Sequence, residues 1–72
     1  YRNLGQYQRA IQDLDEAIRL DPQLAVAYAF RGLAYAMLSE DALAQQDIES
    51  AVELGLDRAE LEALIQEAKY KR

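Results

Sequence analysis

Apolar residues recur along the first part of the chain with the spacing of an α-helix. Between residues 7 and 20 they return every three or four positions, which places them on one helix face. They are Tyr7, Ala10, Ile11, Leu14, Ala17 and Ile18. Asp21-Pro22 is expected to end this helix, because proline disfavours helical geometry in the residue before it. No segment alternates with the two-residue period of a strand, so the pattern predicts an all-α fold.

Residues 25–38 are predicted to form a second helix that is apolar on almost every side. Their sequence, AVAYAFRGLAYAML, carries one charged residue, Arg31. A helix of this composition is normally covered by neighbours on several faces. It falls short of the roughly 20 apolar residues that a membrane span needs. We therefore expect it to pack among three neighbouring helices.

Two further helices follow. Residues 39–41 interrupt the pattern, and a third apolar stripe then ends at Gly55, where a helix C-cap glycine belongs. Asp57 followed by Glu60 resembles a capping box that begins a fourth helix. The stripe of the third helix is Ala44, Ile48, Ala51, Val52 and Leu54, and that of the fourth is Leu61, Leu64, Ile65 and Ala68.

The chain also repeats itself when it is shifted by 34 positions. Ten residue pairs are identical, five of them alanine, and Leu14/Ile48 and Ile18/Val52 are conservative matches. Small residues suit places where helices approach closely, so the repeat concerns packing. The identical pairs are Tyr1/Tyr35, Leu4/Leu38, Ala10/Ala44, Gln12/Gln46, Asp13/Asp47, Ala17/Ala51, Leu20/Leu54, Ala25/Ala59, Ala29/Ala63 and Ala34/Ala68.

A 34-residue period with two helices per period resembles the tetratricopeptide repeat (TPR). Residues 25–58 look like one full unit, with Tyr28 at the first aromatic position and Gly32 at the close-approach glycine. Ser39 departs from the pattern, since it replaces the usual turn glycine. Residues 1–24 look like the second helix of a truncated unit, with matches at Gly5, Tyr7, Ala10, Leu14, Ala17 and Pro22.

Residues 59–72 depart further from the TPR pattern. Glu62 stands at the aromatic position and Gln66 where glycine belongs, so this segment resembles a capping helix with a polar outer face. The resemblance implies a single TPR-like domain over residues 1–72. Its helices would form antiparallel pairs stacked as a right-handed α-solenoid.

Composition narrows the possible functions. The chain has 72 residues, no Cys, no His and a net charge of −5. Disulfides and the commonest metal ligands are therefore excluded, and a nucleic-acid partner is disfavoured because phosphate contacts need a basic face. The carboxylate pairs Asp15/Glu16 and Glu60/Glu62 are interpreted as solvated helix faces. We expect no enzyme, no cofactor and no membrane span, and a soluble chain that is cytoplasmic by default.

The TPR resemblance implies a concave groove lined by the first helix of each unit, which binds a peptide segment. Lys and Asn of the family's two-carboxylate clamp are absent, since Ala29 and Leu33 stand in those places. An apolar groove with an acidic and aromatic edge suits an apolar or amphipathic helix, with basic flanks meeting Glu60 and Glu67. The expected groove residues are Val26, Ala29, Leu33, Ala36, Met37, Glu60, Ala63, Glu67, Tyr70 and Lys71.

Arg31 needs a separate explanation, because buried charges are usually paired. Folding the second and third helices back about Ser39 brings residues 31 and 47 to nearly the same height, which predicts a partly buried Arg31–Asp47 ion pair. In the alternative interpretation, Arg31 points into the groove and holds a ligand carboxylate.

Three functions remain open at this point. The first is a protein–protein interaction or scaffold module that uses the apolar groove. The second is a structural end-segment of a longer solenoid, or a self-assembling unit whose groove is filled by a second copy, as a dimer or by helix exchange. The third, held as the least favoured, is a small-molecule-binding or catalytic helical domain.

Overall fold

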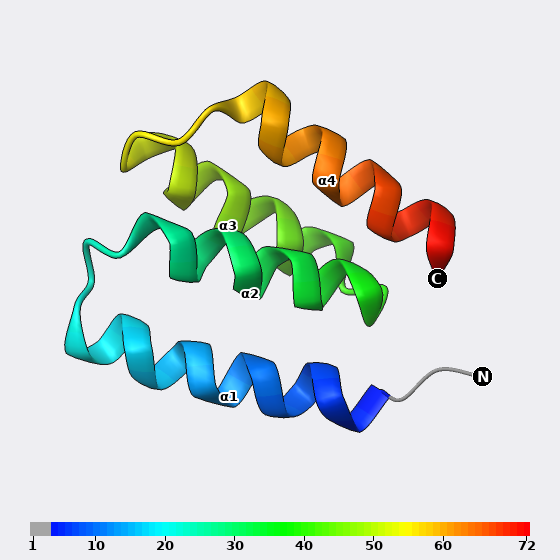
Figure 1. The fold of residues 1–72 in the computed structure, drawn as a ribbon, viewed down its shortest axis with the longest axis horizontal. Helices are drawn as coiled ribbons and strands as arrows, with labels where there is room; N and C mark the ends of the chain where they lie inside the picture. Colours follow the sequence, from blue (N-terminus) through cyan, green and yellow to red (C-terminus); the bar gives the residue numbers. More distant parts are fainter. Residues whose placement is uncertain (1–3) are drawn as a thin grey trace.

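The computed structural model describes residues 4–72, and this part of the chain folds into four α-helices. They are α1 (Leu4–Leu20), α2 (Ala25–Met37), α3 (Asp41–Glu53) and α4 (Arg58–Lys71). Successive helices run in opposite directions and are joined by short turns (Figure 1). No strand occurs among residues 4–72, so the all-α prediction is confirmed for them. The expectation for residues 1–3 lies outside the described residues.

The turns follow from local chemistry. After α1, the Asp21 side chain accepts a hydrogen bond from the Gln23 backbone N–H at 3.1 Å. This bond closes a short turn around Pro22, directly after the end of the helix. At the start of α4, Asp57 accepts hydrogen bonds from the backbone N–H groups of Ala59 and Glu60. Asp57 is therefore the N-cap that the sequence pattern predicted.

Helices α2 and α3 end in the same way. Each is followed by a residue with positive φ, Ser39 at 63° and Gly55 at 117°. The next residue, Glu40 or Leu56, then donates its backbone N–H five residues back, to the carbonyl of Tyr35 or Ala51. This is the Schellman arrangement, which satisfies the last carbonyls of a helix. Ser39 thus adopts a left-handed conformation that glycine populates at lower energy than residues with a Cβ atom.

Helix α2 is the centre of the packing, since it contacts α1, α3 and α4. Helix α3 also contacts α4, whereas α1 packs against α2 alone within the described residues. The molecule extends 34 × 26 × 16 Å along its principal axes. The side of α1 that faces away from α2 has no neighbouring helix among the described residues (Figure 1).

The buried core is small and rich in alanine. It consists of Ala36, Ala44, Ile48, Ala51, Leu61, Ile65 and Ala68, from α2, α3 and α4. Gly32 lets α2 approach α3, because a Cβ atom there would lie 3.2 Å from the Ala44 carbonyl oxygen and from the Asp47 Cβ atom. The core therefore sits on the α3–α4 side of α2, and the α1 side is covered less completely.

Candidate protein-binding groove

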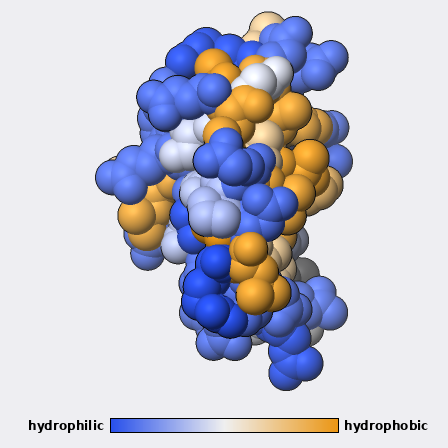
Figure 2. All heavy atoms as spheres, turned by 90° about the vertical axis from the view of Figure 1, so that its left-hand side faces the viewer, coloured by the Kyte–Doolittle hydropathy of each residue, from blue (hydrophilic) through white to orange (hydrophobic). Residues whose placement is uncertain are grey.

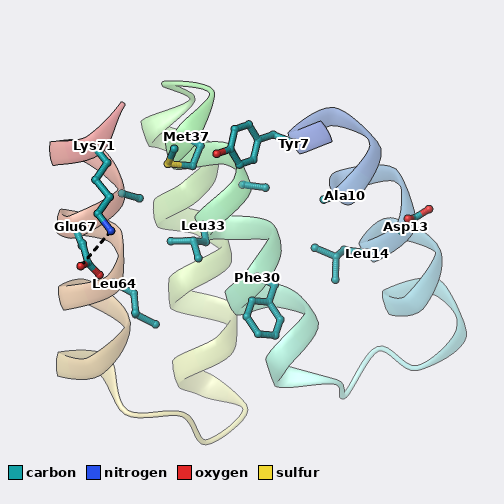
Figure 3. A pocket seen from close by; sticks show the side chains of 12 residues that line it. Tyr7, Ala10, Asp13, Leu14, Phe30, Leu33, Met37, Leu64, Glu67 and Lys71 are labelled. Atoms are coloured by element: carbon teal, nitrogen blue, oxygen red, sulfur yellow. Dashed lines mark ion pairs between the residues drawn. The ribbon is translucent and has the colours of Figure 1, made fainter. Parts of the chain in front are cut away.

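A groove of about 600 Å³ lies between α1, α2 and α4. Figure 3 shows α2 between the other two helices, with Leu14 of α1 and Phe30 of α2 pointing into the space between them. Leu64 extends from α4 toward α2. The large apolar side chains that line the groove are Tyr7, Leu14, Phe30, Leu33, Met37 and Leu64.

The groove presents apolar surface to solvent. Phe30 is 55% exposed and Leu64 is 48% exposed, while Leu33 and Met37 are half-buried and rest against the core. Burial of apolar surface provides about 25 cal/mol per Å², so covering these side chains would be favourable. Leu20 and Leu24, near the α1–α2 turn, are also exposed. Figure 2, which faces that end of the molecule, shows hydrophobic patches among hydrophilic side chains.

Charged groups lie at the rims of the groove. On α4, Lys71 Nζ lies 3.5 Å from Glu67 Oε2 (Figure 3). On α1, Asp13 is exposed and forms no ion pair within residues 4–72. Both rims therefore carry a carboxylate, and the α1 carboxylate is available to a cation of a partner.

The structure brings only part of the predicted groove together. Of the expected residues, Leu33, Met37, Glu67 and Lys71 line it. Five others lie outside it: Ala29 is half-buried, and Val26, Glu60, Ala63 and Tyr70 are exposed on other surfaces.

The expectation for Ala36 is wrong. Ala36 is 0% exposed and belongs to the core with residues of α3 and α4. Its carbonyl oxygen also accepts a hydrogen bond from Arg72 Nη1 at 2.8 Å. The reason is helical geometry: adjacent residues differ in direction by about 100°, so Ala36 faces the core while Met37 faces the groove.

Sequence reasoning missed the α1 wall of the groove. Ala10, Asp13 and Leu14 line it together with Tyr7, and Phe30 and Leu64 were also absent from the expected set. The signal was present in the apolar stripe of residues 7–18, whose members are only partly buried. That stripe was interpreted as packing, because a one-dimensional pattern does not show which faces of a helix are left without a neighbour.

The ion pair expected between Arg31 and Asp47 is present. Arg31 Nε donates to Asp47 Oδ2 at 2.9 Å and Nη2 donates to Oδ1 at 2.7 Å. Nη1 also donates to Asp15 Oδ1 on α1 at 2.8 Å, a partner that the sequence did not indicate. Hydrogen bonding to Asp47 raises the pKa of Arg31 further above its ordinary value. Arg31 does not line the groove, so its geometry does not support the role of holding a ligand carboxylate there.

Two further arginines join elements at the surface. Arg58 donates two hydrogen bonds of 2.7 Å to the Glu49 carboxylate, and Gln45 donates a third. These bonds, that from Arg58 above all, lower the pKa of Glu49 to about 2. Arg72 forms an ion pair with Asp41 at 2.6 Å, and its hydrogen bond lowers the pKa of Asp41. Both pairs connect α3 to the segment that contains α4.

The described residues contain neither a candidate metal-binding cluster nor a candidate membrane-spanning helix. Across residues 4–72, no three carboxylate side chains gather in a way that could hold a metal ion. No helix there is long and apolar enough to cross a membrane. What the described residues do offer is an apolar groove between helices.

Short antiparallel helices with a 34-position internal repeat are typical of helical-repeat proteins. The chain belongs to the TPR repeat family, because the family's TPR repeat model matches residues 1–39, more than half of the chain. No solved structure gives a significant match. TPR repeats are typically interaction modules without catalytic activity, so the family indicates protein partners. The match ends at Ser39, and the 34-position repeat extends the likeness into α3 and α4.

Proposed function

We propose that this chain binds an apolar or amphipathic helix of a protein partner in the groove between α1, α2 and α4. One observation carries the proposal: apolar side chains from three helices converge on one groove, and Phe30 and Leu64 remain half-exposed there. Amphipathic helices bind such grooves through side chains spaced three and four residues apart.

The architecture that we propose for the groove is a short right-handed α-solenoid of antiparallel helix pairs. Its units would be residues 1–24, 25–58 and 59–72, the last acting as a cap. The helix bounds support this division, because α1 and α2 shifted by 34 positions fall on α3 and α4 to within three residues at each end. The exposed Glu60, Glu62 and Gln66 on α4 suit a polar outer face.

The charge of the chain favours a partner with basic residues beside its apolar face. Asp13 and Glu67 stand at the two rims of the groove, and the net charge is −5. Complementary rim charges mainly raise the rate of association and exclude partners of the wrong sign. Glu60 lies outside the groove on α4 and would add to this attraction at longer range.

A structural role is the second candidate, in which the groove is covered within an assembly. The exposed Leu20 and Leu24, which are not groove residues, favour it, since a surface with several apolar patches also suits self-association. Sedimentation equilibrium separates the two: a monomer that binds helices supports recognition, and a tight dimer with its groove protected supports assembly.

Small-molecule binding or catalysis has less support. The volume of the groove is within the range of ligand sites, roughly 300–1,000 Å³. Such sites place polar groups at depth to orient a ligand, whereas the charged residues here stand at the rims.

The test is a screen of helical peptides with the binding surface mapped by amide NMR shifts. We expect the shifts to cluster at Leu14, Leu33 and Leu64. Leu64→Glu should abolish binding, because it places a charge on the apolar wall. Leu43→Glu is the matched control, since Leu43 is also exposed but lies on α3 outside the groove. Equal loss of binding in both variants would exclude the groove as the site.

A further inference from the structure

Because of the internal repeat, the groove wall on α1 can be compared with the equivalent face of α3. The α3 face formed by Ala44, Asp47 and Ile48 is buried against α2. The shift of 34 positions places these three residues on Ala10, Asp13 and Leu14 of α1. All three of the α1 residues line the groove, and none of them is buried. The same surface is therefore covered by a helix at α3 and uncovered at α1.

Two features of α2 show what this surface accepts. Arg31 forms its two-bond ion pair with Asp47, the counterpart of Asp13. Gly32, the next residue, packs against all three residues of the α3 face, at 3.2 Å, 3.2 Å and 3.4 Å from a Cβ atom built on it. A larger residue at that position would hold the helices apart. The α3 face is thus contacted by an arginine and the glycine that directly follows it on α2.

Asp13 has the chemistry to make the same contact. Its carboxylate is exposed at the rim of the groove and has no ion-pair partner within the described residues. Docking of an apolar helix beside it would remove water from the carboxylate, so a matching cation would be needed. Arginine suits this position better than lysine, because its guanidinium bonds a carboxylate through two parallel hydrogen bonds.

We propose that the groove binds an α-helix of another polypeptide that presents an Arg-Gly pair to Ala10, Asp13 and Leu14, with the arginine paired to Asp13. This inference rests on the proposed function and specifies the partner. A second copy of this chain does not meet the requirement as it stands. Its own Arg31-Gly32 lies on α2, which is held by α1, α3 and α4, and removing that helix would dismantle the core.

The probe for the test is a fluorescein-labelled peptide with the sequence of residues 25–38, which carries the Arg-Gly pair of α2. Its variants are R31Q and G32L. The 72-residue protein is titrated into each peptide and anisotropy is measured, for the wild type, Asp13→Asn and Glu53→Gln. Glu53 is the charge-matched control because it is exposed on α3 outside the groove. Circular dichroism verifies that all the proteins fold.

The expected result is a coupled loss. Wild-type protein should bind the parent peptide on the order of tenfold more tightly than R31Q, since the lost bonds involve two charged groups. Asp13→Asn should weaken parent binding by a similar factor and leave R31Q binding unchanged, whereas Glu53→Gln should change neither. The G32L peptide should also bind more weakly to the wild type, because its side chain meets the α1 face.

Three results would overturn the inference. Equal affinity for the parent and R31Q peptides, with both lost in Leu64→Glu, would keep the groove as a helix-binding site and exclude the Asp13 pairing. No binding of either peptide would exclude the Arg-Gly helix as a ligand, and the broader peptide screen would then decide the groove's role separately. A dimer in sedimentation equilibrium that excludes the peptide would make a second copy the occupant.

Discussion

Arg31 and Asp47 join α2 to α3 through two parallel hydrogen bonds of 2.9 and 2.7 Å. The Asp47 side chain is only 6% exposed, and that of Arg31 is 21% exposed. The third contact of the guanidinium, to Asp15, reaches α1. The ring centroids of Tyr28 and Tyr35 lie 5.5 and 5.9 Å from the guanidinium carbon, within the range of cation–π attraction. One side chain therefore connects three helices.

The first prediction concerns the loss of this pair. Asp47→Asn should lower the free energy of unfolding by about 2 kcal/mol, because it leaves a largely buried guanidinium without its main counter-charge. Urea denaturation followed by circular dichroism measures the change.

Asp13→Asn is the control for this measurement, since it makes the same change at the equivalent repeat position. Asp13 is exposed and unpaired within residues 4–72, so its replacement should shift stability by less than about 0.5 kcal/mol. If Asp47→Asn also changed the free energy of unfolding by less than about 0.5 kcal/mol, the Arg31–Asp47 pair would not stabilise the fold.

The second prediction concerns the turn after α2. Ser39 has φ of 63°, which is energetically unfavourable for any residue that has a Cβ atom. Ser39→Gly should therefore stabilise the protein, by about 0.5–1 kcal/mol after the greater freedom of glycine in the unfolded chain is subtracted. The thermal midpoint should rise.

Gly55→Ala tests the same reasoning in reverse. Gly55 ends α3 in the same motif with φ of 117°, and a Cβ built there meets no described atom within 4 Å. Any loss of stability must then come from the backbone, and about 1–2 kcal/mol is expected. If Ser39→Gly lowers the midpoint, the serine must contribute something other than its backbone conformation.

The sequence predicted the helices well because their signals are local. Apolar periodicity, the Asp57 cap and the glycine at position 55 all act within a few residues, and each was found where it was expected. Arg31–Asp47 was also foreseeable, because a short turn at Ser39 fixes the register of two antiparallel helices.

The groove was harder to predict because it depends on which helix faces are left uncovered. Leu14 and Leu33 both line the groove, yet only Leu33 was expected there. Ala36 was assigned to the groove from its place in the repeat, but the rotation of α2 puts it in the core. Asp13 and Asp47 are equivalent by sequence, and only the three-dimensional packing distinguishes the exposed one from the buried one.

The third prediction concerns acid. The pKa of Glu49 is lowered to about 2 in the folded protein, against 4.5 ordinarily, chiefly by hydrogen bonds from Arg58. Above about pH 4.5 the carboxylate is ionised in both states, and the pair contributes its full stabilisation. As the pH falls from there toward about 2, the unfolded chain takes up the proton first, so this contribution is lost.

Urea midpoints of the wild type and Glu49→Gln should therefore differ near neutral pH and converge as the pH approaches about 2.5. Because the pair is exposed, concentrated salt should also reduce the difference. Glu53→Gln, which alters an exposed carboxylate without an ion pair in the described residues, should show no such convergence. A difference that stays constant with pH would mean that Glu49 acts through packing and not through charge.

The fourth prediction concerns Arg72, which attaches the end of α4 to two other helices. Its Nη1 atom donates to the Ala36 carbonyl oxygen of α2 at 2.8 Å, and the guanidinium pairs with Asp41 at the start of α3. Arg72→Gln should increase amide hydrogen exchange in the last turn of α4 with little change in α2, since local opening follows the loss of local contacts. Lys69→Gln is the matched control, because it removes one positive charge from the same turn while Arg72 keeps its bonds. Equal exchange in the two variants would show that general charge at the helix end, and not the Arg72 contacts, protects this turn.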